Sequence, residues 1–223
     1  MVGKRLKAFV SAVAICVTGA ALAPSGAMAV DPILFVHGWS SSASTWNTMI
    51  GRFEKDGYTK SQLRAYSYNT SQSNKTTAET IVKSEVEKLK KETGAEKVDI
   101  VAHSMGSLNS RWYIKFVKEG EANVDDWVSL GGPNHGTTTA NFCFSTACVE
   151  MRPNSTFLNE LNAGDETPGS VNYGTWWSPC DSIINPDSSV PLSGATNTET
   201  ACISHTSLPT DETVYTQVRE FVK

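Results

Sequence analysis

The stretch VDIVAHSMGSLNS, from Val98 to Ser110, decides which fold the sequence predicts. Its first residues are mostly apolar and predict a buried strand, whereas the residues after Gly106 have a helical pattern. Between the two stands Ser104, with the small residues Ala102 and Gly106 two positions away on either side. A serine on a tight turn between strand and helix indicates a nucleophile elbow, in which the hydroxyl is exposed at the carboxyl end of the strand. AHSMG is a variant of the G-x-S-x-G pattern, and the alternative for Ser104 is the N-cap of the following helix.

Segments along the rest of the chain extend this alternation of strand and helix. Strands are expected at residues 32–36, 63–69, 97–103, 124–132 and 169–177, and helices at 76–94, 107–120 and 211–223. The alternation predicts an α/β protein with a mostly parallel central sheet and helices on both faces. Thr76 with Glu79 resembles a capping box, and Gly94 resembles a helix stop. The stretch from Asn134 to Thr167 is expected to be a long functional loop.

The N-terminal segment has the pattern of an export signal. Lys4, Arg5 and Lys7 precede the apolar run AFVSAVAICVTGAALA, and AMA ending at Ala29 matches a signal-peptide cleavage site. The alternative is a transmembrane anchor, but the apolar run is short and rich in small residues. We therefore expect a signal peptide at residues 1–29, a single domain at residues 30–223, and a protein that a bacterium secretes.

The charge of the chain excludes some classes of partner. Its formal net charge is −4, and removal of the signal peptide, with three basic residues and no acid, changes this to −7. No basic cluster remains that would suit nucleic acid, and anionic membranes would not attract this surface. A neutral substrate fits the composition better than a polyanion.

The cysteines outside the signal are even in number, which is typical of disulfides in an exported protein. Four remain, at Cys143, Cys148, Cys180 and Cys202, and they allow three pairings. Cys143–Cys148 and Cys180–Cys202 are favoured, since local pairing leaves the first bridge within one loop. A zinc site is the alternative, but no C-x-x-C pair supports it, and we expect no metal.

A serine hydroxyl is a poor nucleophile unless a base takes its proton. In α/β sheets of this kind the chain order is nucleophile, acid, histidine. His205 fits that order because it stands late in the chain, before the last expected helix. His103 adjoins the serine, so its side chain should point elsewhere, and His37 and His135 stand too early.

The acid that orients the histidine should follow a strand and precede His205. Asp181 does so directly after the aromatic strand TWW, and we expect it to fix the imidazole tautomer. Asp187 is the main competitor, followed by Asp165 and Glu166. A Cys180–Cys202 bridge would tie the acid loop to the histidine loop.

Two backbone N–H groups are expected to form an oxyanion hole. One belongs to Met105, just after the serine, and the other to Trp39, in the loop VHGWS after the first strand. The acyl chain of a substrate is expected to lie along apolar residues nearby, for which Trp39, Met105, Trp176 and Ile203 are the candidates.

Five motifs together resemble the small secreted bacterial lipases, the class 2 lipase family of the α/β-hydrolase fold. They are FVHGW, AHSMG, SLGGPNHGT, CDSII and SHTSL, and the resemblance covers nearly all of the chain after the signal. It implies a carboxylic ester hydrolase acting on acylglycerols, with Ser104 as nucleophile, Asp181 as acid and His205 as base. It implies no metal or organic cofactor, and a monomer that meets its ester substrate at a lipid–water interface without inserting stably into membranes.

Other functions on the same scaffold stay open at this point. A cutinase-like polyester hydrolase and an acyltransferase would use the same three residues. A secreted lipid-binding protein without catalysis is a further alternative, against which the complete set of three residues argues.

Overall fold

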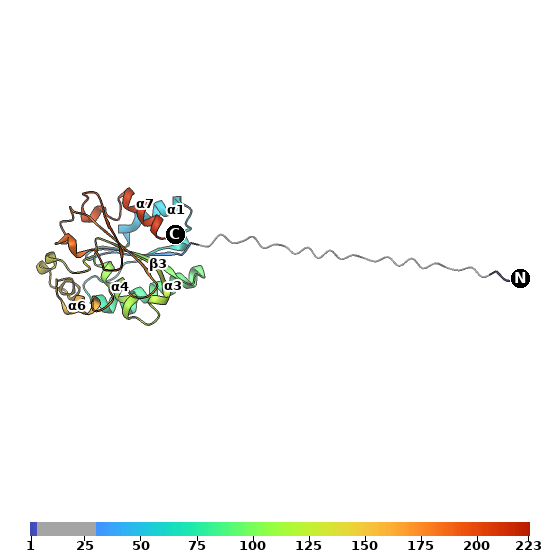
Figure 1. The fold of residues 1–223 in the computed structure, drawn as a ribbon, viewed down its shortest axis with the longest axis horizontal. Coiled ribbons are helices and arrows are strands. Elements are labelled where there is room, and N and C mark those ends of the chain that lie inside the picture. Colours follow the sequence, from blue (N-terminus) through green and yellow to red (C-terminus); the bar gives the residue numbers. More distant parts are fainter. Residues whose placement is uncertain (4–29) are drawn as a thin grey trace.

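The computed structural model describes residues 1–3 and 30–223 (Figure 1). The expected signal peptide falls largely on residues 4–29 and so lies outside the described residues. Among the residues that are described, no helix combines the length and the apolar character needed to span a bilayer.

A sheet of six strands, all parallel, forms the centre of the fold, with the order β2-β1-β3-β4-β5-β6. The strands are β1 (Ile33–Val36), β2 (Leu63–Ala65), β3 (Val98–His103), β4 (Val124–Leu130), β5 (Asn172–Trp177) and β6 (Thr196–Glu199). Every residue of β1 and β3 is buried, as expected for a parallel sheet with both faces covered. The carboxyl ends of β3, β4 and β5 meet at one edge, which is where ligands bind in open α/β sheets.

Helices cover both faces of the sheet (Figure 1). They are α1 (Asn47–Lys55), α2 (Asn74–Thr76), α3 (Lys83–Thr93), α4 (Gly106–Phe116), α5 (Thr146–Glu150), α6 (Thr156–Leu161) and α7 (Glu212–Phe221). α1 and α7 share one apolar cluster, in which Phe53 packs edge-on against Tyr215 with the ring centroids 5.0 Å apart. α3, α4 and α6 share the other cluster, on the opposite face. Burying one side chain such as Phe53 contributes about 1.5–3 kcal/mol, so both layers stabilise the sheet.

The structure differs from the sequence expectations about secondary structure at four places. The strand expected at 63–69 ends at Ala65, and the edge strand β6 was not predicted. The helix expected at 76–94 begins at Asn74, with the Ser73 side chain as its cap, so the capping box at Thr76 was wrong. It passes through a wider π-helical stretch, Thr77–Val82, and ends at Gly94, whose φ of 75° is left-handed. The long excursion contains α5 and α6 rather than loop alone.

Acidic side chains gather at the amino ends of the strands, opposite the edge where Ser104 lies. Carboxylate oxygens of Asp31, Asp99 and Asp125 lie within 4.8 Å of one another. Asp99 is buried, and its Oδ1 accepts a hydrogen bond from the Asp126 N–H at 3.1 Å. Burial, and then the charges of Asp126 and Asp31, raise the pKa of Asp99 well above its usual range. Burial also raises the pKa of Asp126 to about 6.

Replacing Asp99 with asparagine is therefore expected to stabilise the protein at pH 8. Because its pKa is raised on folding, the folded state binds this proton more tightly than the unfolded state. The free energy of unfolding then falls as pH rises from about 4 through the folded-state pKa. Asparagine keeps a side-chain oxygen that accepts the Asp126 N–H, but it carries no charge. We therefore expect the free energy of unfolding to rise by at least about 1 kcal/mol, because one pKa unit corresponds to about 1.4 kcal/mol. Urea unfolding measures it, and a gain no larger at pH 8 than at pH 5 would contradict the explanation.

Candidate active site

Ser104 lies on the turn that joins β3 to α4. Its φ is 54°, in the left-handed region that side chains rarely adopt, at a cost of about 1–3 kcal/mol. The turn is closely packed: a Cβ added to Gly106 would lie 2.4 Å from the carbonyl oxygen of Val36. The Ser104 N–H donates to the Leu130 carbonyl at 2.9 Å, which fixes the strained backbone against β4. The sequence expectation of a tight turn with small neighbours describes this geometry well.

A cavity of about 670 Å³ opens above this turn, and both Ser104 and His205 line it. Its apolar lining includes Trp39, Phe142 and Ile183. The remaining lining is largely hydroxyl-bearing or small, and within the described residues it includes no lysine, arginine, aspartate or glutamate. A cavity of this size and character suits an uncharged, partly apolar ligand.

His205 and Asp181 form a buried hydrogen-bonded pair beside the cavity. The imidazole Nδ1 lies 2.7 Å from Asp181 Oδ2, and Asp181 Oδ1 accepts the N–H groups of Ile183 at 2.8 Å and Ile184 at 3.0 Å. Burial raises the pKa of Asp181, but the hydrogen bond and charge of His205 and the two backbone N–H groups outweigh it, so its pKa lies below the ordinary value. An ionised Asp181 can only accept, so Nδ1 of His205 carries a proton, and in the neutral imidazole Nε2 is the nitrogen that can accept one.

Two neighbours hold His205 in place. His103 Nε2 lies 3.0 Å from the His205 carbonyl oxygen, and the two rings lie 4.6 Å apart. Burial lowers the pKa of His103 to about 3, so it is a neutral donor at this contact. Gly131 has a φ of 57°, and a Cβ there would lie 3.1 Å from His205 Nδ1 and 3.2 Å from Asp181 Oδ2. The left-handed φ and the close approach to the pair both favour glycine at this position, directly after β4.

The hydroxyl of Ser104 and the ring of His205 face the same cavity but are not hydrogen-bonded in this conformation. Among the hydrogen bonds of residues 30–223, none joins the two side chains. Contacts of this kind are often long in the absence of substrate and tighten only when it binds.

Disulfides fix two segments of the site. Cys180 is bonded to Cys202 with the Cα atoms 4.9 Å apart, and Cys143 to Cys148 with the Cα atoms 5.7 Å apart, the pairing that the sequence favoured. The first bridge connects the residue before Asp181 to the segment that leads into His205. By loop entropy it stabilises the fold by about 3 kcal/mol, and it limits how far the two loops can separate.

The oxyanion hole expected from the sequence requires the backbone N–H groups of Trp39 and Met105 to be free of other acceptors. Within residues 30–223, neither N–H donates to a protein acceptor. The Met105 N–H is one of the free donors at the start of α4, and the turn at Trp39 is fixed by its neighbours. The Tyr68 hydroxyl donates to the His37 carbonyl at 2.7 Å, and the Ser40 N–H donates to Thr70 Oγ1 at 3.1 Å.

The substrate-binding residues expected from the sequence lie in different places. Trp39 lines the cavity, but Met105, Trp176 and Ile203 are not among the lining residues. Met105 and Trp176 are buried in the two apolar clusters, and Ile203 packs against the second of them. These three expectations are corrected, because their side chains face the core.

The other acids considered in the sequence, and His135, make contacts away from Ser104. Glu166 Oε1 lies 2.7 Å from His135 Nε2, and Asp187 Oδ1 accepts the Ser188 N–H at 2.7 Å. Asp165 Oδ1 accepts the Thr167 N–H at 2.9 Å. Asp181 alone among these candidate acids contacts His205.

Sequence reasoning missed several residues that shape the site, notably Gly131, Thr137, Phe142 and Ile183. The pair of glycines at 131 and 132, at the end of a predicted strand, could have indicated a close approach of backbone to side chains. Thr137 and Phe142 belong to the excursion that was expected to be functional, but the sequence did not single them out.

Comparison with known proteins places this geometry in a family context. The family model described as Lipase (class 2) matches residues 30–219. The mature Bacillus licheniformis lipase BlEst2 superposes with a TM-score of 0.75 at 17% identity, covering 88% of this chain and 93% of that one. Aspergillus fumigatus lipase B gives a TM-score of 0.70 at 15% identity, over 83% of this chain and 51% of that one. A marine microorganism esterase gives a TM-score of 0.57 at 15% identity, over 86% of this chain and 95% of that one. At these identities the structural likenesses show the α/β-hydrolase fold.

Proposed function

Since the chain belongs to the class 2 lipase family, we propose that it is a secreted serine ester hydrolase that acts on acylglycerols. The family match and the lipase and esterase neighbours support an ester hydrolase. The proposal goes beyond this in three respects, which are the serine mechanism, the acylglycerol substrate and secretion. Its catalytic unit is residues 30–223, preceded by the signal peptide at residues 1–29.

One observation supports the serine mechanism above all others: His205, which is hydrogen-bonded to the buried Asp181, lines the same cavity as a serine on a strained turn. In the proposed first step, Ser104 Oγ attacks the ester carbonyl while His205 Nε2 takes its proton. Asp181 keeps the other proton on Nδ1 and stabilises the imidazolium that forms.

The oxyanion of the tetrahedral intermediate would be stabilised by the N–H groups of Trp39 and Met105. Loss of one such donor costs about 10²- to 10³-fold in rate. The alcohol then leaves with the proton from His205, and the acyl group stays on Ser104. Water, deprotonated by His205, attacks the acyl-enzyme and releases the fatty acid.

The cavity lining supports an uncharged acyl substrate, because apolar side chains and hydroxyls surround the serine. Two disulfides support an oxidising, extracellular location, in agreement with the export pattern of the N-terminal segment.

Labelling with a fluorophosphonate tests the nucleophile directly. We expect one adduct per folded molecule, on the tryptic peptide that contains Ser104, and none after heat denaturation. The activated hydroxyl should react because His205 can take its proton. Peptide mass spectrometry identifies the site, and Ser40, Ser41 and Ser44 in the same cavity serve as internal controls. An adduct on one of these serines, or none at all, would count against the proposed mechanism.

A further inference from the structure

Two exposed phenylalanines lie on one loop at the mouth of the cavity. Phe142 is 86% exposed and Phe144 83% exposed, and no other large apolar side chain within residues 30–223 is as exposed as either. They flank Cys143, which forms the disulfide with Cys148. We call residues 140–148 the disulfide loop. Phe142 and Cys143 line the cavity itself, as does the half-exposed Trp39.

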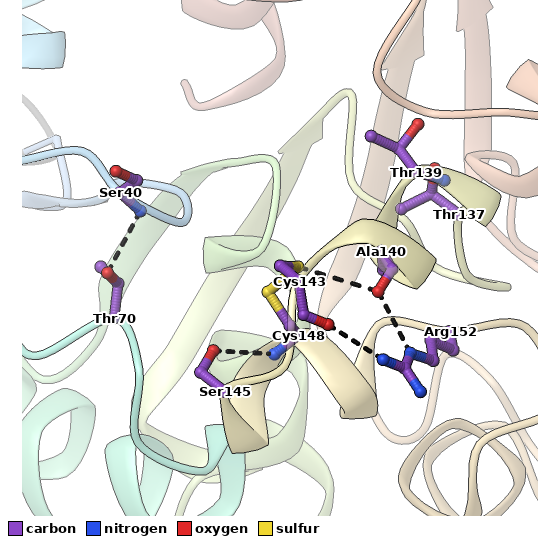
Figure 2. Close-up of a disulfide and its surroundings, with 9 residues drawn as sticks. All are labelled: Ser40, Thr70, Thr137, Thr139, Ala140, Cys143, Ser145, Cys148 and Arg152. Carbon is purple, nitrogen blue, oxygen red and sulfur yellow. Dashed lines mark hydrogen bonds between the residues drawn. A yellow bond between two sulfur atoms is a disulfide. The ribbon is translucent and has the colours of Figure 1, made fainter.

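A disulfide and several hydrogen bonds brace the backbone of the disulfide loop (Figure 2). The Arg152 guanidinium donates from Nε to the Ala140 carbonyl at 3.1 Å and from Nη2 to the Cys143 carbonyl at 2.9 Å. The disulfide closes the other side of the loop, and Ser145 Oγ accepts the Cys148 N–H at 3.4 Å. The phenylalanines are therefore presented to solvent by a fixed backbone.

Two chain segments that line the cavity, one of which contains the whole loop, carry no acidic or basic side chain apart from histidine. Residues 127–149 include no lysine, arginine, aspartate or glutamate, and neither do residues 36–51, which supply Trp39 and the opposite side of the cavity. The nearest cation, Arg152, has its Nε and Nη2 engaged by the loop's own carbonyls. The chain as a whole has a net charge of −4. An anionic surface would therefore meet no cationic side chain in these two segments. The net negative charge of the chain would repel it.

We propose that the disulfide loop is a preformed anchor, which inserts Phe142 and Phe144 into a lipid surface of no net charge and so places the cavity mouth on it. This inference rests on the proposed function, because it states that the ester substrate lies in a lipid surface. Apolar side chains in an exposed patch gain free energy on leaving water, and aromatic rings suit the boundary between headgroups and acyl chains. Since the loop is already exposed and clamped, binding requires no opening of a lid.

Flotation with phosphatidylcholine vesicles tests the anchor, using the full secreted chain with Ser104→Ala to prevent hydrolysis. Phe144→Ser is expected to weaken vesicle partitioning about tenfold, because one aromatic side chain no longer leaves water. Adding Phe142→Ser should weaken it about tenfold again. The matched control is Phe116→Ser, which removes a half-exposed phenylalanine from the end of α4 farthest from Ser104 and should change partitioning little.

Turnover separates this inference from the proposed function. In the active protein, Phe144→Ser should leave the hydrolysis of soluble p-nitrophenyl acetate unchanged, since Phe144 does not line the cavity, and should slow hydrolysis of a tributyrin emulsion. If the parent hydrolyses neither ester but still floats with vesicles, the proposed function fails and the anchor stands.

Three results would overturn the anchor. The first is a Phe144→Ser variant that floats as well as its parent. The second is tighter binding to vesicles that contain phosphatidylglycerol than to phosphatidylcholine alone. The third is that the parent does not bind vesicles but forms a concentration-dependent dimer, and that Phe144→Ser abolishes this dimer. The loop would then bind a second copy of the chain.

Discussion

Replacing Ser104 with alanine is expected to lower the hydrolysis of p-nitrophenyl butyrate by at least about 10⁴-fold, because the attacking atom is lost. The fold should be nearly unaffected. Ser104 Oγ makes no hydrogen bond to another part of residues 30–223, so its removal leaves no partner unsatisfied. The backbone N–H keeps its bond to the Leu130 carbonyl, and alanine meets the same φ of 54°. Thermal melting of the two proteins should therefore coincide within about 2 °C, since a change that removes no hydrogen bond and one oxygen atom facing the cavity should cost no more than about 0.5 kcal/mol.

Ser107→Ala is the matched control for Ser104→Ala. Ser107 is buried one helical turn further on, where its Oγ accepts a hydrogen bond from Ser129 Oγ at 2.9 Å. Its loss should cost about 1 kcal/mol of stability and leave the rate within a few-fold of the parent. If the Ser104→Ala protein hydrolysed the ester at the parent rate while the Ser107→Ala protein was slower, Ser104 would be excluded as the nucleophile.

The turn at Ser104 was predictable because its requirements are local. A strand and a helix approach closely there, so small residues are needed at fixed spacing, and Ala102 and Gly106 satisfy this within five residues of sequence. The contact of Asp181 with His205 was predictable for a similar reason: Asp181 follows a strand, and the carboxyl ends of parallel strands share one edge of the sheet.

The edge strand and the cavity lining were harder to predict, because tertiary contacts decide them. β6 has the sequence TNTE and is mostly exposed, so it carries no hydrophobic pattern, and only its pairing with β5 makes it a strand. Trp176 lies near the site in the sequence, but its side chain packs in the apolar cluster that α1 and α7 share. It packs edge-on against Phe221, with the centroids 5.5 Å apart, and its Nε1 donates to Gln217 at 2.9 Å. Proximity to a strand end therefore did not reveal which face a side chain occupies.

Replacing Asp181 with asparagine is expected to lower turnover by about 10³- to 10⁴-fold while keeping the fold. The reason lies in the two oxygens of the carboxylate. Oδ1 accepts two backbone N–H groups, from Ile183 and Ile184, and this demand fixes the asparagine oxygen in the same place. The amide nitrogen must then face His205 Nδ1, where the carboxylate Oδ2 now accepts at 2.7 Å.

An amide nitrogen can only donate, so Nδ1 of His205 in the Asp181→Asn variant must be the acceptor and its proton must move to Nε2. Nε2 then has no lone pair with which to take the proton of Ser104. Nitrogen chemical shifts of the His205 ring should report this change of tautomer directly, and the kinetic loss should appear in kcat. Asp187→Asn is the control, since that carboxylate only accepts the neighbouring Ser188 N–H, and its rate should match the parent. If Asp181→Asn kept parental turnover while Asp187→Asn lost it, the acid would have to be reassigned and the loop after β5 would need to move to bring residue 187 to His205.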